Sequence, residues 1–303
     1  MSKLQKNFKE TLRDALTQLL WKQWSTLGIA SFLEPQKTWV IDPEALTVAT
    51  TFWQNEDLRL YEIARAWLLK YRDYWMQTRY KKIIKYCIEM EKGLLRKSNL
   101  INFLQYKLSL QDSQHIHERQ REILKPLPIK NPPLIRLKLR GIFGREARSE
   151  VFLYYLYHRE GTSLSIAKET FLEQKSVYSV AKKWQETGML ERRMGKKTGY
   201  GMPDRVKKAW LNALEIKTLP QYLNWGRVFT GLCLIMEALS IEPWGNDSYL
   251  RSSFYRDILP LFAELREKLR ISFPEPTLYP GEAFTSVFED FVVSAMNKLE
   301  SLE

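Results

Sequence analysis

Short polar and basic side chains lie close together between Gln174 and Lys183, and their chemistry suits hydrogen bonding to nucleic-acid bases. Apolar residues recur among them at intervals of three and four, which predicts a helix from about Gln174 to Thr187 with one buried face. Amide, hydroxyl and ammonium groups on the opposite face can pair with base edges in a major groove. The side chains expected to face bases are Gln174, Lys175, Ser176, Tyr178 and Ser179.

A second group of cations follows this helix and suits contacts to phosphates. Gly188 is expected to end the helix, because glycine readily adopts the left-handed conformation of a C-terminal cap. Residues 189–194 then predict a strand, and residues 195–199 a tight, basic hairpin tip. The side chains expected to contact phosphates are Lys182, Arg192, Arg193, Lys196 and Lys197.

Two preceding helices would position this surface. Apolar residues from Val151 to Tyr157 predict a helix that stops at residues 158–161. Thr162 or Ser163 should cap a short helix, and residues 170–173 should form the turn before the longer one. Two short helices joined by a brief turn, followed by a basic hairpin, are typical of domains that place one helix in a major groove.

Residues 145–202 resemble the winged helix-turn-helix domains of bacterial and archaeal MarR/ArsR-like regulators. The phrases that carry the resemblance are Thr162-Ser163-Leu164-Ser165-Ile166-Ala167, Gln174-Lys175-Ser176-Val177-Tyr178 and Gly188-Met189-Leu190-Glu191-Arg192-Arg193. The resemblance covers roughly a fifth of the chain, and it departs from the family pattern at the turn, where Phe171-Leu172 is bulky. It implies a DNA-binding domain with a recognition helix and a small β-wing.

The charge distribution favours the same interpretation. The formal net charge is +12, and residues 125–202 hold 16 Lys/Arg against 7 Asp/Glu. Residues 1–124 hold 20 against 14, and residues 203–303 hold 11 against 14. The basic excess therefore concentrates around the helix-turn-helix pattern, as expected for a nucleic-acid-binding surface. A membrane-surface site would need a basic amphipathic helix with exposed large apolar residues, and every such stretch is better explained as core.

A proline-rich stretch precedes this domain. Four prolines in residues 125–133 predict an extended linker, because proline disrupts a helix interior. Apolar and basic residues then alternate in residues 134–139, which favours a short strand or a semi-rigid arm. Arg136, Lys138 and Arg140 would lie on one side of the arm and reach phosphates or the minor groove. The alternation could equally build the third strand of the wing sheet.

The flanking segments are expected to be helical. Asp42-Pro43 is a strong helix start, and a helix from Arg79 to Glu91 has a basic face that is either solvated or a further DNA contact. Pro260 should interrupt a later helix. The apolar stripe of the last helix is either core or half of a dimer interface.

The expected fold is therefore mainly α. It comprises an all-α N-terminal domain (residues 1–124), a basic Pro-rich linker or arm (125–140), a winged helix-turn-helix with a small β-wing (141–203) and a C-terminal helical domain (204–303).

The composition is that of a soluble globular protein, with 45% hydrophobic and 27% charged residues. The first twenty residues favour an amphipathic helix over a signal peptide, and the most apolar run, residues 228–239, is too short to span a bilayer. Cys87 and Cys233 lie far apart in helical contexts, which favours two buried thiols in a reducing cytoplasm over a disulfide.

No residue pattern indicates catalysis or metal binding. Gly195-Lys196-Lys197-Thr198 lacks the spacing of a phosphate-binding loop, and no G-x-S-x-G motif occurs. His115 and His117 are two positions apart, whereas a metal shared on a helix favours ligands four positions apart. We therefore expect no enzymatic activity, no metal and no cofactor.

The sequence thus predicts a cytoplasmic protein that binds double-stranded DNA sequence-specifically, as a prokaryotic transcriptional regulator. A homodimer is expected, because twofold proteins bind twofold sites. The alternative is a protein-interaction scaffold, such as an antitoxin-like regulator of a defence operon, that uses the winged helix to dock a protein partner. RNA binding is less favoured, because no aromatic platform for stacking bases is evident.

Overall fold

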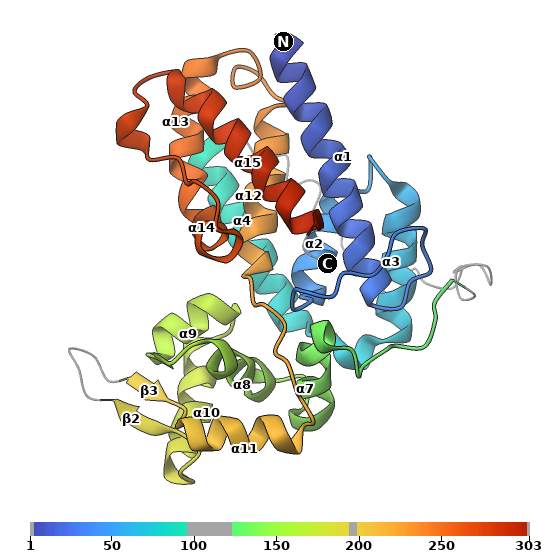
Figure 1. Ribbon diagram of the computed structural model, residues 1–303, viewed down its shortest axis with the longest axis vertical. Coiled ribbons are helices and arrows are strands. Elements are labelled where there is room, and N and C mark those ends of the chain that lie inside the picture. The colour runs from blue at the N-terminus through green and yellow to red at the C-terminus, as the bar shows by residue number, and fades with distance from the viewer. Residues whose placement is uncertain (1–2, 96–122, 194–198, 302–303) are drawn as a thin grey trace.

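The computed structural model describes residues 3–95, 123–193 and 199–301. In these ranges the chain is mainly helical, with a small antiparallel sheet of three strands (Figure 1). The α-helices are α1 (Lys3–Thr26), α2 (Pro43–Phe52), α3 (Leu58–Lys70), α4 (Gln77–Leu95), α7 (Ile135–Phe143), α8 (Ala147–Tyr157), α9 (Ser163–Thr170), α10 (Gln174–Glu186), α11 (Asp204–Ala213), α12 (Trp225–Ala238), α13 (Ser248–Ile258), α14 (Ala263–Leu269) and α15 (Ala283–Ser301). The strands are β1 (Glu160–Gly161), β2 (Glu191–Arg193) and β3 (Gly199–Gly201), and short 3-10 helices are η1 (Arg72–Tyr74), η3 (Pro132–Leu134), η4 (Leu259–Phe262) and η5 (Pro276–Leu278).

Helices from both ends of the chain form one helical body. α1 packs along α15, and α2 packs against α12 (Figure 1). A single hydrophobic core runs through α1–α4 and α12–α15, and it includes the fully buried side chains of Trp24, Trp67 and Phe262. The expected division into separate N-terminal and C-terminal domains therefore does not match the packing, because both segments contribute to one core.

Residues 135–193 and 199–222 form a second unit, called the central unit below, with a core that Val40 also joins. α8, α9 and α10 pack together, and the sheet has the strand order β1-β3-β2. Tyr200 of β3 lies opposite Gly161 on one side and Arg192 on the other. α11 also belongs here, because the ring of Trp210 lies 5.4 Å from that of Phe152.

α7 differs from the prediction for the stretch before α8. Residues 135–143 form a helix instead of an extended arm or a strand, and the third strand of the sheet is β1. The basic residues of this stretch fit a helix equally well, since Arg136 and Arg140 are one turn apart and share a face. α7 lies between the two cores, with Leu137 in the core of the helical body and Leu139 in that of the central unit.

Local helix signals in the sequence are confirmed. The side chain of Asp42 caps α2 by accepting a hydrogen bond from the backbone N–H of Ala45 at 3.1 Å. Thr162 caps α9, with Ser165 completing a reciprocal capping box. Pro260 lies in η4, which separates α13 from α14.

The apolar stripe of α15 is core. The buried residues of this helix are Phe284, Thr285, Phe288, Phe291, Val292, Ala295, Met296 and Leu299. They pack within the helical body, where the rings of Phe288 and Tyr255 stack with centroids 4.4 Å apart. A homodimer would therefore have to use a different surface.

An extended segment, residues 38–41, lies between the two connections that join the central unit to the helical body. The backbone N–H of Val40 donates to the carbonyl of Gln221 at 2.8 Å, where the chain leaves the central unit. The backbone N–H of Ile41 donates to the carbonyl of Pro133 at 2.9 Å, where the chain approaches it. One short segment thus binds both connections.

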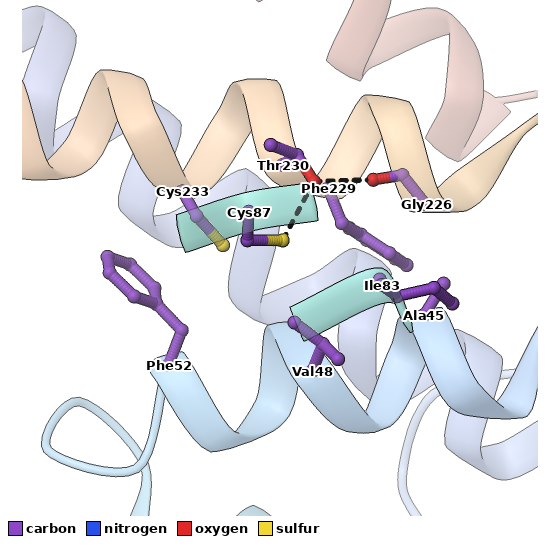
Figure 2. A pocket seen from close by; sticks show the side chains of 9 residues that line it. All are labelled: Ala45, Val48, Phe52, Ile83, Cys87, Gly226, Phe229, Thr230 and Cys233. Atoms are coloured by element: carbon purple, nitrogen blue, oxygen red, sulfur yellow. Dashed lines mark hydrogen bonds between the residues drawn. The ribbon is translucent and has the colours of Figure 1, made fainter. Parts of the chain in front are cut away.

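Cys87 and Cys233 are free thiols buried in the helical body, as expected. Both line a nearly apolar cavity of about 10 Å³ between α2, α4 and α12 (Figure 2). The Sγ atom of Cys87 lies 2.9 Å from Oγ1 of Thr230, and burial raises the pKa of Cys87 to about 11. Such a thiol is almost fully protonated at neutral pH and is therefore a poor nucleophile.

Across the part of the chain that the structure describes, no helix has both the length and the apolar character needed to cross a bilayer.

Candidate nucleic-acid interface

α10 presents one exposed face of polar and basic side chains. Val177 and Ala181 are completely buried in the central unit, so the opposite face of the helix points to solvent. All five side chains expected to face bases are exposed, and the large ring of Tyr178 is 48% exposed. Lys182 lies one turn after Tyr178 and is exposed as well. This face therefore brings together Gln174, Lys175, Ser176, Tyr178, Ser179 and Lys182.

The start of α10 is held by contacts from two other helices. Nε2 of Gln174 donates to Oγ of Ser163 at 3.3 Å, which links α10 to the start of α9. Glu173, at the N-cap of α10, forms an ion pair with Lys82 of α4 in the helical body. A carboxylate at this position also interacts favourably with the positive end of the helix dipole.

The turn between α9 and α10 contains a phenylalanine in the left-handed backbone region. Phe171 has φ 55° and ψ 43°, a conformation that costs a non-glycine residue about 1–2 kcal/mol. Its ring is buried in the core of the helical body, 5.4 Å from the ring of Tyr86. A Cβ at Gly226 of α12 would lie only 2.5 Å from this ring, so the glycine makes room for it. The bulky turn residue that departs from the family pattern therefore anchors the turn to the helical body.

β2 adds two exposed arginines to the interface. Arg193 lies 3.6 Å from the carboxylate of Glu191 and packs across Gly201, where a Cβ would lie 3.1 Å from its Nε atom. Arg192 is exposed on the same strand. The other two predicted phosphate contacts, Lys196 and Lys197, lie outside the described residues.

Cations outnumber carboxylates along α10 itself. Lys175, Lys182 and Lys183 are all exposed, and Glu186 is the acidic residue of the helix. Lys182 lies 4.0 Å from Glu186 in an exposed pair, which contributes little free energy and leaves the ammonium group accessible. The face is therefore positively charged.

Two of the three predicted arm residues are buried in a cluster of charged side chains. The cluster joins α2, α4, α7 and α8, and each member is at most 3% exposed. It contains three carboxylates and three guanidinium groups: Asp42, Glu44, Glu150, Arg79, Arg136 and Arg140. The opposite charges balance, which is what allows ionised groups to remain inside a protein.

Short contacts hold the cluster together. Arg140 donates to both carboxylate oxygens of Glu44 at 2.7 Å and to Glu150 at 2.6 Å. Arg79 donates to Asp42 at 2.5 Å and to Glu44 at 2.8 Å. Nη1 of Arg136 lies 2.5 Å from Oδ2 of Asp42. Arg79 also donates through Nε to the carbonyl of Thr170 at 2.8 Å, so the cluster reaches the turn before α10.

The neighbouring guanidinium groups keep the carboxylates of Asp42 and Glu150 ionised. Burial alone would raise the pKa of Asp42, but the charges of Arg136 and Arg79 outweigh it and hold that pKa well below its usual range. Burial likewise opposes ionisation of Glu150, yet Arg136, Arg140 and Arg79 lower its pKa. The carboxylates of Asp42 and Glu150 are therefore charged at neutral pH and retain their ion pairs.

The expectation of an exposed basic arm is thus wrong. The guanidinium groups of Arg136 and Arg140 face carboxylates inside the protein and are inaccessible to a nucleic acid. Lys138 is partly buried and donates to the carbonyl of Leu214 at 2.5 Å, which ties α7 to the end of α11. The candidate interface is consequently limited to α10 and β2, because Arg136 and Arg140 are buried.

Cations near the start of α10 were not among the predicted site residues. Lys168 is exposed on α9, and Lys82 and Lys85 extend from α4 on the facing side of a groove. The basic face of α4 can be predicted from the sequence. The position of this face beside α10 cannot, because the ion pair between Lys82 and Glu173 joins segments that are far apart in the chain.

The described residues contain no group of three or more His, Cys, Asp or Glu side chains placed to hold a metal ion. His158 stacks on Tyr154 with ring centroids 4.1 Å apart, and burial lowers its pKa. His115 and His117 lie outside the described residues.

Comparisons with protein-family models, with curated proteins and with solved structures give no match for this chain, so any function rests on the interface itself.

Proposed function

We propose that the central unit is a winged helix-turn-helix that binds double-stranded DNA sequence-specifically, with α10 as its recognition helix. The observation that carries this proposal is the exposed face of α10, where hydrogen-bonding and cationic side chains follow one another opposite the buried Val177 and Ala181. Such a helix can enter a major groove, while β2 lies beside it as part of a wing. We further propose that the chain is a prokaryotic transcriptional regulator.

The side chains of α10 differ in what they can recognise. Lys175 can donate to the O6 and N7 atoms of guanine, and the amide of Gln174 can pair with adenine. Gln174 would have to exchange its hydrogen bond with Ser163 for a base. Tyr178 can pack against a thymine methyl group or donate its hydroxyl. Phosphates would be contacted by Lys182, Arg192 and Arg193, and by Lys196 and Lys197, which the sequence predicts to form a hairpin tip.

The test begins with selection of bound sequences from a random duplex pool. Recovery of a consensus supports the proposal, and a palindromic consensus would also indicate a twofold assembly. Affinity for that duplex should then fall roughly a thousandfold between 50 and 200 mM salt if about six phosphate contacts form. Failure to enrich any sequence, together with weak salt dependence, would overturn the proposal.

Two lysine variants distinguish base recognition by α10 from a general effect of lost positive charge. Lys175→Ala should weaken binding to the selected duplex by about tenfold or more and relax preference at one base pair. Lys92→Ala is the matched control, because Lys92 is an exposed lysine of the helical body and lies outside the proposed interface. Equal effects of the two variants would show that α10 does not read bases.

Protein docking is the second candidate function, and one observation favours it. Tyr178 and Leu164 are large apolar side chains that are 48% and 43% exposed on the central unit, and exposed aromatic residues often anchor protein interfaces. Replacing Lys196 and Lys197 with Glu distinguishes the two functions. A DNA-binding protein would lose affinity for every duplex, whereas a scaffold would keep its protein partner.

A further inference from the structure

A row of polar and cationic side chains runs along the solvent-exposed side of α4. Gln77, Lys81 and Lys85 are exposed and follow one another at intervals of four residues, so they share one face of the helix. α4 begins beside the central unit and runs away from it within the helical body (Figure 1). The row therefore occupies the end of α4 that lies nearest to the central unit.

Two contacts fix this end of α4 beside the start of α10. Lys82 forms an ion pair with Glu173, the N-cap residue of α10. Arg79 is buried and donates through Nε to the carbonyl of Thr170 at 2.8 Å, in the turn that precedes α10. The exposed row of α4 thus adjoins the first residues of the proposed recognition helix.

A groove separates α4 from α9 at this point, and cations line both of its sides. Lys82 and Lys85 extend from α4, and Lys168 extends from α9. The carboxylates in the lining are those of Glu89 and Glu173. The groove is therefore bordered by positive charge from the helical body on one side and from the central unit on the other.

Several of these cations are available to an anion. Lys81 and Lys168 are exposed and form no ion pair within the described residues. Lys85 lies 3.6 Å from Glu89, but both side chains are more than 60% exposed, so the pair is weak and easily exchanged. Lys81, Lys85 and Lys168 are thus accessible cations that the proposed recognition by α10 does not use.

The dimensions of B-DNA place a phosphate backbone close to such a surface. In a helix-turn-helix, the first residues of the recognition helix contact the bases. The major groove is only about 12 Å wide, and an α-helix with its side chains is about 10–12 Å across, so the two backbones flank the helix closely. The protein surface that adjoins the start of α10 would therefore face one of these backbones.

From this arrangement we infer that α4 of the helical body binds the phosphate backbone of the same duplex whose bases α10 contacts. Lys81 and Lys85 are about 6 Å apart along the helix axis. One strand of B-DNA carries a phosphate for about every 3.4 Å of its axis, so each ammonium group can meet a different phosphate. Lys168 would contact the same strand from the other side of the groove. This inference rests on the proposed DNA-binding function and extends its contact surface beyond the central unit.

The two surfaces would contribute differently to recognition. Contacts to phosphates position a protein on DNA but carry no sequence information of their own. α4 would therefore add affinity and hold α10 in register, whereas base preference would come from α10. The helical body would act as a second, sequence-independent DNA clamp.

The first test measures duplex affinity of the full-length double variant Lys81→Ala with Lys85→Ala at several salt concentrations. Loss of two phosphate contacts should weaken binding at 100 mM salt by at least about tenfold and reduce the slope of log affinity against log salt by about 1.8. The consensus recovered from a random duplex pool should stay unchanged. The thermal unfolding midpoint should also stay unchanged, because both side chains are exposed.

Two single variants on the same helix provide the controls. Lys92→Ala removes a lysine seven residues after Lys85, about 10 Å farther from the central unit, and should leave affinity and salt slope unchanged. Glu89→Gln removes the carboxylate beside Lys85 and should strengthen duplex binding several-fold. A gain of affinity cannot result from a damaged fold. Equal losses in Lys81→Ala and Lys92→Ala would overturn the inference.

Duplexes in which single phosphates are replaced by uncharged methylphosphonates locate the contact on the DNA. For the wild type, at least one replacement beside the bases read by α10 should weaken binding several-fold. The same replacement should have little further effect on the double variant, because the effects of two groups in direct contact are not additive. Full additivity at every phosphate would show that α4 does not contact the backbone.

The outcomes separate this inference from the proposed function. If the double variant keeps wild-type affinity and salt slope on a duplex that Lys175→Ala weakens, the inference fails and the proposed function stands. If the double variant loses affinity but the wild type shows no base preference, α4 is a duplex-binding surface and sequence-specific recognition by α10 is refuted. Absence of duplex binding by the wild type would refute both.

Discussion

Replacing Arg140 with methionine should destabilise the protein far more than the loss of an exposed cation. The Arg140 side chain is completely buried, and its guanidinium group donates to Glu44, to Glu150 and to the carbonyl of Tyr74 at 2.7 Å. Without it, three buried carboxylates would face two guanidinium groups, leaving one negative charge uncompensated. Removing one partner from a buried ion pair costs about 3–5 kcal/mol. At about 2 °C for each kcal/mol in a chain of this size, the unfolding midpoint should fall by about 6–10 °C.

Urea denaturation followed by tryptophan fluorescence and circular dichroism measures this loss. The matched control is Arg148→Met, because Arg148 forms an exposed pair 3.5 Å from Glu146 and should change stability by less than about 1 kcal/mol. The double variant Arg140→Met with Glu150→Gln leaves two carboxylates and two guanidinium groups, so it should be more stable than the single variant. This expectation is refuted if the free energy of unfolding of Arg140→Met lies within about 1 kcal/mol of the wild-type value. It is also refuted if the double variant is no more stable than Arg140→Met alone.

The pH dependence of the same variant provides an independent check. In the wild type the pKa values of Asp42 and Glu150 lie below their unfolded values, so the stability they contribute is present above about pH 4–5 and is lost as the pH falls. In Arg140→Met the uncompensated carboxylate should have a higher pKa, and the uptake of a proton would remove its unpaired negative charge. The stability difference between wild type and variant should therefore narrow as the pH is lowered toward 4.

Two further predictions concern single side chains in the helical body and the turn. Phe171→Ala and Phe171→Gly should each cost about 3–5 kcal/mol in urea denaturation, because both delete a buried ring. The glycine variant should be the more stable by about 1 kcal/mol, since only glycine adopts φ 55° without strain; an alanine variant of equal or greater stability would contradict the left-handed conformation. Cys87 and Cys233 should release no thionitrobenzoate from Ellman's reagent in the native protein and react fully in denaturant, because both are buried and burial raises the pKa of each. Prompt reaction of the native protein would show that one of these thiols is accessible.

The sequence predicts α10 and its buried face well because the relevant signals are local. The spacing of Val177 and Ala181 sets which face of α10 is buried, and Thr162 marks the start of α9 through a side chain that caps its own helix. The Asp42-Pro43 pair and Pro260 act locally in the same way. In each case the residue acts on backbone within one turn of itself, so its consequence can be predicted without knowing the fold.

The buried arginines could not be predicted in this way. A basic residue in a basic segment is expected at the surface unless a carboxylate lies nearby in the chain. Arg136 instead pairs with Asp42, which is far away in the sequence. Alternating apolar and basic residues also fit both a strand and a helix. As the helix α7, this stretch packs against two cores at once, and those contacts are not visible in the sequence. The core shared by the two ends of the chain was unpredictable for the same reason, because contacts between α1 and α15 join residues more than 250 positions apart.

The two connections of the central unit restrict the rotations open to it. A domain joined by a single connection can turn about any axis through that point. Here the incoming and outgoing chains are both hydrogen-bonded to residues 38–41, so rotation about one connection would pull apart the hydrogen bonds at the other. Any rotation would also break the buried ion pair between Glu44 and Arg140 and withdraw the ring of Phe171 from the core of the helical body. The central unit therefore moves together with the helical body, and anything bound to α10 would keep a fixed orientation relative to that body.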